Sequence, residues 1–184
     1  ITSIYAATKL YEARKNKKLQ LVLIVSVPYQ ELAKQWTANL KTFSIRPIPC
    51  WKSKANWYGD LTRDALAFKM GAIDFIGIVV VNRTLQSEAF QKIIKGFNSD
   101  QILFIGDECH SHGAKKISEA LPDAYYRLGL SATPFRSEED EFDSPFPDDA
   151  RKRISNYYDR IVARYSLGDA INDEVLCEYD YHIV

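Results

Sequence analysis

The sequence is poor in cysteine, in long apolar runs and in net charge. Three cysteines among 184 residues, none in a CxxC spacing, suggest neither a disulfide framework nor a four-cysteine zinc site, and they favour a reducing, cytoplasmic compartment. The longest apolar run, Phe75 to Val81, is far shorter than the roughly 20 residues that span a bilayer, so we expect no membrane segment and no signal peptide. The 24 basic and 24 acidic residues cancel, so any surface for nucleic acid must be local.

Four short, mainly apolar runs are typical of core strands in a sheet that is covered on both faces: 21–27, 75–81, 102–106 and 126–130. Apolar residues at three- and four-residue spacing predict helices at 1–16, 29–43, from 60 or 62 to 71, 86–97 and 114–121. The proline-containing segment 44–50 is expected to be an edge strand or an extended connection. This alternation predicts an α/β fold of one domain, with helices around a mainly parallel central sheet.

The last quarter of the chain has a different character. Residues 137–149 contain seven acidic residues and two prolines without periodicity, which predicts an acidic surface loop. Beyond it we expect a helix at 151–158, a short strand at 163–166, a short helix at 167–171 and an extended segment at 178–184.

Two carboxylates, Asp107 and Glu108, follow the buried run 102–106 directly. Charged groups cannot share the burial of that strand cheaply, so they lie at its carboxyl end, where open α/β sheets bind their ligands. One carboxylate there can hold the water shell of Mg²⁺ beside a nucleoside triphosphate, and Asp107 is placed for this. Glu108 can act as the base that orients and deprotonates an attacking water. The alternative is that the pair only caps a helix or begins a turn.

Two motifs in order carry a resemblance to a known family. Asp107-Glu108-Cys109-His110 resembles motif II, the DEAD/DEAH-box Walker B sequence, and Ser131-Ala132-Thr133 resembles motif III of superfamily-two helicases. Motif Ia of many relatives, Pro-x-x-x-Leu-x-x-Gln-Trp, is similar to Pro28, Leu32, Gln35 and Trp36. The tail, from Tyr158 through Tyr165-Ser166-Leu167 to Val175-Leu176-Cys177, is similar to the branch that contains type III restriction subunits and DNA-repair helicases.

The resemblance implies a RecA-like three-layer sandwich, the first motor domain of an ATP-dependent helicase or translocase that acts on DNA rather than RNA. It implies catalytic roles for Asp107, Glu108 and His110, with ATP held at the first two and Mg²⁺ at Asp107 through water. His110 would link the hydrolysis site to motif III, formed by Ser131, Ala132 and Thr133. Nucleic acid would contact Pro28, Tyr29, Gln35, Asn82, Arg83 and Thr84.

The chain also departs from the family pattern. No Gly-Lys pair occurs in the 184 residues, so the family's phosphate loop, G-x-x-x-x-G-K-[ST], is expected to precede Ile1. A second RecA-like domain is likewise expected outside residues 1–184. We therefore expect a domain trimmed after its phosphate loop that alone is inactive and binds neither ATP nor Mg²⁺. In the region of motif Ib, Asn82 and Arg83 stand where relatives often have threonine and an aromatic residue.

Several other interpretations stay open at the level of sequence. A non-catalytic RecA-like interaction or scaffold domain without nucleotide binding is the main alternative, and a metal-dependent nuclease using Asp107 and Glu108 is a weaker one. Cys109, His110 and His112 are zinc-ligand types without a fourth ligand at a recognisable spacing, and His112 is expected at the surface. Trp36 and Trp51 could stack on bases, although Trp36 falls on an apolar helical face. The basic stretch 14–18 is expected to be a solvated helix end.

Overall fold

The computed structural model describes residues 2–132, 148–175 and 177. Thr133, most of the predicted acidic loop and the predicted extended segment 178–184 therefore lie outside the described residues. Asp148 and Asp149, which we expected in the loop, instead begin the helix α7 (Asp148–Tyr158).

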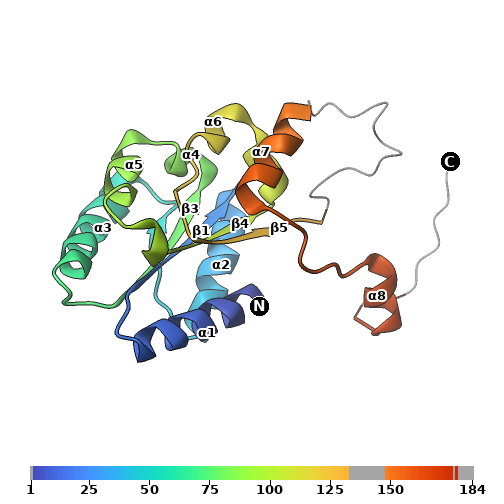
Figure 1. The fold of residues 1–184 in the computed structure, drawn as a ribbon, viewed down its shortest axis with the longest axis horizontal. Helices are drawn as coiled ribbons and strands as arrows, with labels where there is room; N and C mark the ends of the chain where they lie inside the picture. Colours follow the sequence, from blue (N-terminus) through green and yellow to red (C-terminus); the bar gives the residue numbers. More distant parts are fainter. Residues whose placement is uncertain (1, 133–147, 176, 178–184) are drawn as a thin grey trace.

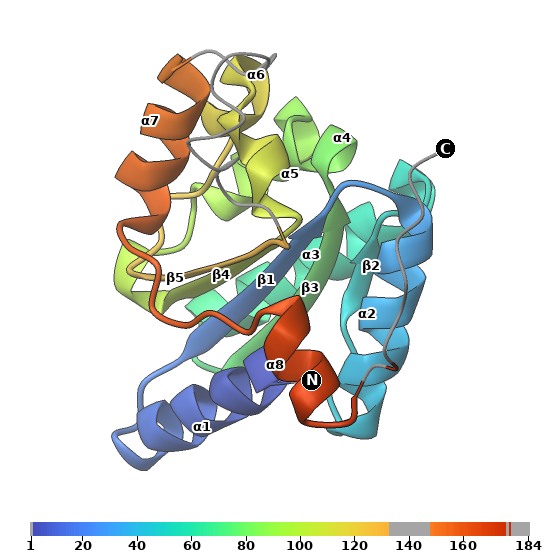
Figure 2. The same cartoon turned by 90° about the vertical axis from the view of Figure 1, so that its right-hand side faces the viewer.

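Five strands form one fully parallel sheet in the order β2-β3-β1-β4-β5, which Figure 2 shows across the molecule. Every neighbouring pair is parallel, and β1 lies at the centre between β3 and β4. The strands are β1 (Leu21–Val27), β2 (Ile48–Cys50), β3 (Phe75–Val81), β4 (Ile102–Asp107) and β5 (Tyr126–Leu130). The predicted α/β class is confirmed, and the edge strand predicted within 44–50 is β2.

Helices cover both faces of the sheet (Figure 1), which makes the three-layer arrangement of a RecA-like fold. Alternate residues of β1 point to opposite layers, because successive side chains of a strand face opposite ways. Leu21, Leu23 and Val25 pack with α1 (Thr2–Asn16) and α2 (Gln30–Thr42). Val22 and Ile24 pack on the other face. That face is covered by α3 (Lys54–Lys69), α5 (Glu88–Ile94) and α7, with the shorter α4 (Asn82–Leu85) and α6 (Lys115–Ser118) at its edge.

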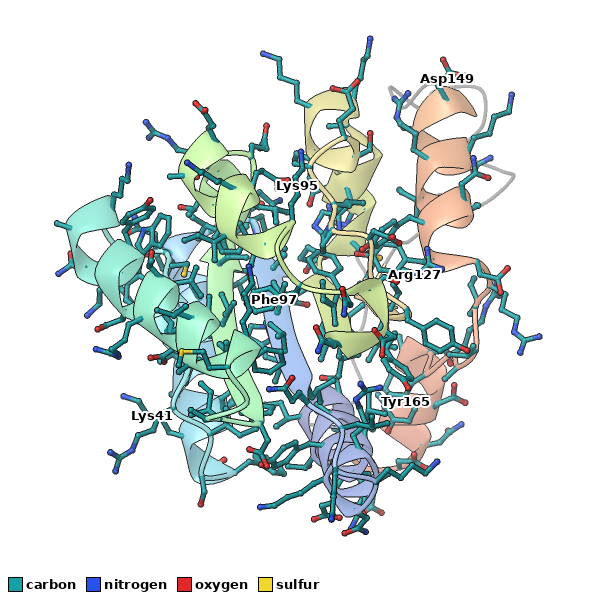
Figure 3. The ribbon with its side chains drawn as sticks, turned by 60° about the vertical axis from the view of Figure 1, so that its left-hand side comes forward. Lys41, Lys95, Phe97, Arg127, Asp149 and Tyr165 are labelled. Carbon is teal, nitrogen blue, oxygen red and sulfur yellow. The ribbon has the colours of Figure 1, made fainter. Side chains whose placement is uncertain are left out.

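Helix boundaries differ from the prediction in three places. α3 begins at Lys54, six residues before the earliest predicted start. Ser53 occupies the N-cap position without a capping hydrogen bond from its side chain, and Trp57 on the added turn is buried. The helix predicted for 86–97 is shortened to α5, and a separate helix that was not predicted, α4, precedes it. Phe97 (Figure 3) lies beyond α5, and its ring packs edge-on against Phe68. The helix predicted for 114–121 is reduced to α6, preceded by the 3₁₀ helix η2 (Cys109–Gly113).

Of the two elements predicted for residues 163–171, the strand is wrong and the helix is confirmed. Residues 163–166 do not form the predicted strand; they are exposed and extended, with no ladder partner. The predicted short helix is present as α8 (Leu167–Asn172), where Ser166 and Asp169 form a capping box. Among the described residues, no helix has the length and apolar character that a bilayer crossing requires.

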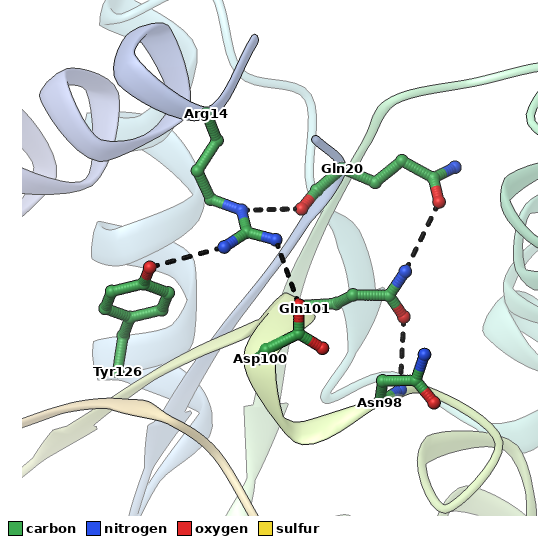
Figure 4. A network of polar contacts seen from close by, with 6 residues as sticks. All are labelled: Arg14, Gln20, Asn98, Asp100, Gln101 and Tyr126. Carbon is green, nitrogen blue, oxygen red and sulfur yellow. Dashed lines mark hydrogen bonds and ion pairs between the residues drawn. The ribbon is translucent and has the colours of Figure 1, made fainter. Parts of the chain in front are cut away.

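The buried Arg14 side chain contacts residues at the amino ends of β1, β4 and β5 (Figure 4). Motif II lies at the opposite edge of the sheet. The Arg14 side chain donates to the Gln20 carbonyl at 2.8 Å and to the Tyr126 hydroxyl at 3.3 Å, and its guanidinium lies 3.7 Å from an Asp100 carboxylate oxygen. Gln20 in turn accepts from the Gln101 side chain at 3.3 Å, next to the 3₁₀ helix η1 (Ser99–Gln101) that leads into β4. The expectation of a solvated helix end is wrong for Arg14, which is buried.

Candidate active site

Asp107 is the last residue of β4, and its carboxylate is held from two directions. The Trp36 indole N–H donates to Asp107 Oδ2 at 2.7 Å, and the Glu108 backbone N–H donates to Asp107 Oδ1 at 3.2 Å. A carboxylate offers about four lone-pair positions, so each oxygen can still accept from water. The half-buried Asp107 is therefore fixed in orientation and still able to accept hydrogen bonds from a hydrated cation.

Glu108 adopts a left-handed backbone conformation, with φ of 50° and ψ of 49°. This conformation costs a residue with a Cβ roughly 1–2 kcal/mol and is uncommon outside glycine, asparagine and aspartate. The turn it makes ends β4 and starts η2 at Cys109, so the Glu108 side chain leaves the plane of the strand and stays partly exposed. Such strain occurs at functional sites more often than elsewhere, which fits a chemical role for this residue.

His110 joins the end of β4 to the end of β5. Its Nδ1 lies 3.3 Å from Glu108 Oε2 and 3.1 Å from Ser131 Oγ. Because one ring nitrogen carries at most one proton, a proton on Nδ1 is shared between the carboxylate and the hydroxyl, or Nδ1 accepts from Ser131. The contact from His110 to Ser131 that the resemblance implies is thus present, while Thr133 lies outside the described residues. The exposed Ala132 follows Ser131.

His112 is buried, which corrects the expectation of a surface position. Its ring stacks on Tyr158 of α7, and His112 Nδ1 lies 2.7 Å from the Tyr158 hydroxyl oxygen. Burial, with a smaller contribution from His110, lowers the pKa of His112 to about 4. α7 also holds η2 through Arg153, whose Nε donates to the Gly113 carbonyl at 2.7 Å. The short segment after motif II is therefore packed against a helix far along the chain.

The neutral state of His112 predicts a pH dependence of stability. An unfolded histidine has a pKa near 6.5 and the buried His112 one of about 4, so the unfolded chain binds more protons between these values. The free energy of unfolding should therefore be highest above pH 6.5 and fall by roughly 3 kcal/mol as the pH drops to 4. Urea unfolding of the wild type and of His112→Phe measures this, since the variant cannot titrate there. Equal pH slopes in the two proteins would contradict the assignment.

Asn82 is also buried, and it connects three elements. The Ser26 hydroxyl of β1 donates to Asn82 Oδ1 at 2.9 Å, and Asn82 Nδ2 donates to Ser111 Oγ of η2 at 3.0 Å. The side chain is thus occupied inside the domain, so the expectation that Asn82 reaches nucleic acid from the surface is corrected. Its amide links the strand before motif Ia to the segment after motif II.

Two of the other predicted nucleic-acid residues, Arg83 and Thr84, line a pocket of about 540 Å³ beyond the carboxyl ends of β2 and β3. The pocket brings Gln30, next to Tyr29 in the sequence, together with Arg83 and Thr84. Tyr29 and Gln35 are exposed on α2, and Pro28 is half-buried. No carboxylate is among the residues that line this pocket, which are Gln30, Trp51, Lys52, Ser53, Lys54, Trp57, Val81, Arg83, Thr84, Ser87 and Ala89.

Sequence reasoning missed the contribution of the turn after β2. Lys52 and Lys54 add two cations to Arg83 at the pocket, and Lys52 Nζ lies 5.4 Å from the centre of the Trp51 ring. Trp51 is held in place by its indole N–H, which donates to Thr37 Oγ1 of α2 at 3.3 Å. The Trp-Lys-Ser-Lys run at 51–54 was the available signal, since interleaved basic and aromatic residues are typical of nucleic-acid surfaces.

The zinc interpretation receives no geometric support from the described part of the chain. Within it, no group of three or more histidine, cysteine, aspartate and glutamate side chains is placed to hold a metal ion together. His112 instead stacks on Tyr158, and His110 lies between Glu108 and Ser131.

The fold and the site together define the class of the protein. It is a parallel α/β domain in which β4, next to the central β1, ends at Asp107 and continues as Glu-Cys-His, with His110 bonded to Ser131 after the neighbouring strand β5. The chain belongs to the family described as type III restriction enzyme, res subunit, which matches residues 1–136. It is thus a first RecA-like domain of a superfamily-two helicase. Searches of curated proteins and of solved structures return no significant match.

Proposed function

We propose that this domain carries half of the ATP-hydrolysis site of a DNA helicase or translocase. The observation that supports this most strongly is the chain of contacts from Asp107 and Glu108 through His110 to Ser131, at the carboxyl ends of two adjacent parallel strands. Ligands of open α/β sheets bind at such ends. In this proposal residues 1–184 work with a phosphate loop and a second RecA-like domain that these residues do not include.

The residues present fit a hydrated Mg²⁺ ion. Asp107 offers carboxylate oxygens at a fixed orientation, and magnesium prefers oxygen ligands and retains several waters. When bound, the ion would neutralise charge on the phosphates of ATP. Glu108 would accept a proton from the attacking water. His110, whose Nδ1 lies 3.3 Å from the Glu108 carboxylate, would hold that carboxylate in place and connect it to Ser131.

The phosphate loop would supply most of the affinity for ATP, because its backbone amides and lysine surround the phosphates. We therefore expect calorimetry to detect ATP binding by the native gene product that contains this domain, weakened by Asp107→Asn. The 184-residue chain alone should bind ATP negligibly. Micromolar affinity of the chain alone would show that these residues suffice, and no binding by either protein would favour the non-catalytic scaffold alternative.

The pocket beside Arg83 is the proposed contact for the nucleic-acid backbone. Lys52, Lys54 and Arg83 offer positive charge without a lining carboxylate, which gives a neutral chain a local anion-binding surface. Tyr29 and Gln35 extend the surface along α2, where both are exposed. DNA is the expected partner because the family description names a restriction enzyme.

Replacing Lys52 and Arg83 by alanine should weaken DNA binding by about 10-fold or more at low salt and reduce the salt dependence of log K by about one per lost phosphate contact. Fluorescence anisotropy with labelled DNA and RNA oligonucleotides measures both. Lys17→Ala combined with Lys41→Ala is the matched control, since it removes the same two positive charges from exposed lysines that do not line the pocket. An equal effect of the control would show that only net charge matters, and tighter RNA binding would reverse the DNA assignment.

Buried cysteines and the nuclease alternative also bear on the proposed function. Cys50 and Cys109 are free and buried, and burial raises the pKa of both thiols, that of Cys109 to about 11, so both are weak nucleophiles. The nuclease alternative predicts nicking of plasmid DNA with Mg²⁺ or Mn²⁺; intact plasmid would eliminate it.

A further inference from the structure

Trp36 has a polar contact that its position on an apolar helix face does not predict. Its ring lies in the core between α2 and the sheet, beside Ala33 and Leu40, and only 8% of the residue is exposed. Its indole N–H nevertheless reaches Asp107 Oδ2 at 2.7 Å, 71 residues away in the sequence. An N–H donor bonded to a carboxylate at this distance forms a strong, charge-assisted hydrogen bond.

We propose that Trp36 is the positioning residue for Asp107 and transmits movement of α2 to that carboxylate. The inference rests on the proposed function in one respect, namely that Asp107 holds the water shell of Mg²⁺. Outer partners that orient a metal-binding carboxylate typically change metal affinity by 10-fold to 100-fold when they are removed. Trp36 supplies such a partner from a different element of the fold.

The second part of the inference follows from the two faces of α2. The helix buries Trp36 toward the sheet and exposes Gln35 on its outer side, with Tyr29 at its N-cap, and these two residues belong to the proposed nucleic-acid surface. Hydrogen bonds from N–H to oxygen weaken beyond roughly 3.2 Å, so a shift of α2 by about 1 Å would break the bond to Asp107. Binding of nucleic acid on one face can thereby alter a carboxylate on the other.

The simpler interpretation is that Trp36 is a core residue whose donor has found an acceptor, as buried indoles usually do. Trp36→Phe distinguishes a core residue from a positioning residue, because it keeps an aromatic ring in the core and removes the N–H. Tyr157→Phe is the matched control: it also keeps a partly buried aromatic ring and removes its one donor, where the acceptor is the Pro122 carbonyl rather than Asp107.

Nuclear magnetic resonance of the ¹⁵N-tryptophan-labelled 184-residue chain tests the contact without any activity. The three tryptophans give three indole N–H signals, which Trp36→Phe and Trp51→Phe assign. We expect the Trp36 signal to move more than the other two in Asp107→Asn and Asp107→Ala, because both variants remove the charged acceptor of its N–H. A Trp36 signal that is unchanged by both Asp107 variants would overturn the inference.

Hydrolysis by the native gene product tests the consequence. Trp36→Phe should raise the Mg²⁺ concentration for half-maximal ATP hydrolysis by about 10-fold and reduce the stimulation by DNA, while Tyr157→Phe leaves both unchanged. An unaltered Mg²⁺ requirement in Trp36→Phe would show a purely structural role. If the wild type hydrolyses no ATP, the proposed function fails, and the resonance experiment still decides whether Trp36 positions Asp107.

Discussion

Glu108→Gln should lower the rate of ATP hydrolysis by the native gene product about 100-fold to 10,000-fold, the range that a general base contributes. Glutamine has nearly the shape of glutamate but cannot accept a proton from the attacking water. The left-handed backbone at this position is retained, since the substitution changes only the end of the side chain. The ATP affinity should therefore change little while hydrolysis is nearly lost.

Single-turnover hydrolysis and calorimetry on the same preparation separate these effects. Glu119→Gln is a suitable control, because Glu119 is an exposed residue directly after α6 and lies outside motif II. Unfolding curves that overlap for wild type and Glu108→Gln would exclude loss of structure as the cause. Unchanged turnover in Glu108→Gln would remove Glu108 from the role that we assign to it.

Gly106→Ala should destabilise the domain by about 2–3 kcal/mol, at the upper end of the usual cost of overpacking a core. A Cβ at Gly106 would overlap the Tyr158 hydroxyl and lie 2.6 Å from His112 Cε1. These atoms cannot move apart easily, since His112 and Tyr158 are stacked and hydrogen-bonded to each other. Position 106, immediately before Asp107 in β4, therefore accommodates only glycine while α7 packs against it.

Chemical denaturation of four proteins tests this account: the wild type, Gly106→Ala, Tyr158→Phe and the double variant. Removing the hydroxyl should restore part of the stability lost in Gly106→Ala, so the two changes should be non-additive. Gly59→Ala is the control, because a Cβ there meets nothing within 4 Å and Gly59 lies inside α3, where alanine is favoured by about 1 kcal/mol. Additive losses in the double variant would show that Tyr158 does not cause the clash.

The sheet could be predicted from the sequence because its strands are buried on both faces. β1, β3 and β5 have the predicted bounds, and β4 extends the predicted run by Asp107. The same logic located Asp107 and Glu108, since an apolar run that ends in charges marks the end of a strand. The start of α3 was missed, although Trp57 lies four residues before Leu61 and continues the buried face of the helix.

The contacts around the site could not be predicted, because they join residues that are distant in the sequence. His112 could not be assigned to the interior, because the Tyr158 ring that covers it comes 46 residues later. Asn82 resembled a surface residue in motif Ib, yet its partners Ser26 and Ser111 lie in other elements. The burial of Trp36 followed from helical spacing, whereas the direction of its N–H depends on how α2 packs against the sheet.

The most direct test of a motor function is the release of phosphate from ATP by the native gene product, with and without DNA. We predict Mg²⁺-dependent hydrolysis that DNA accelerates and that Glu108→Gln nearly abolishes. Folded protein that releases no phosphate in either condition, or that releases it equally in the wild type and in Glu108→Gln, would contradict the assignment of Asp107 and Glu108 to an ATP-hydrolysis site.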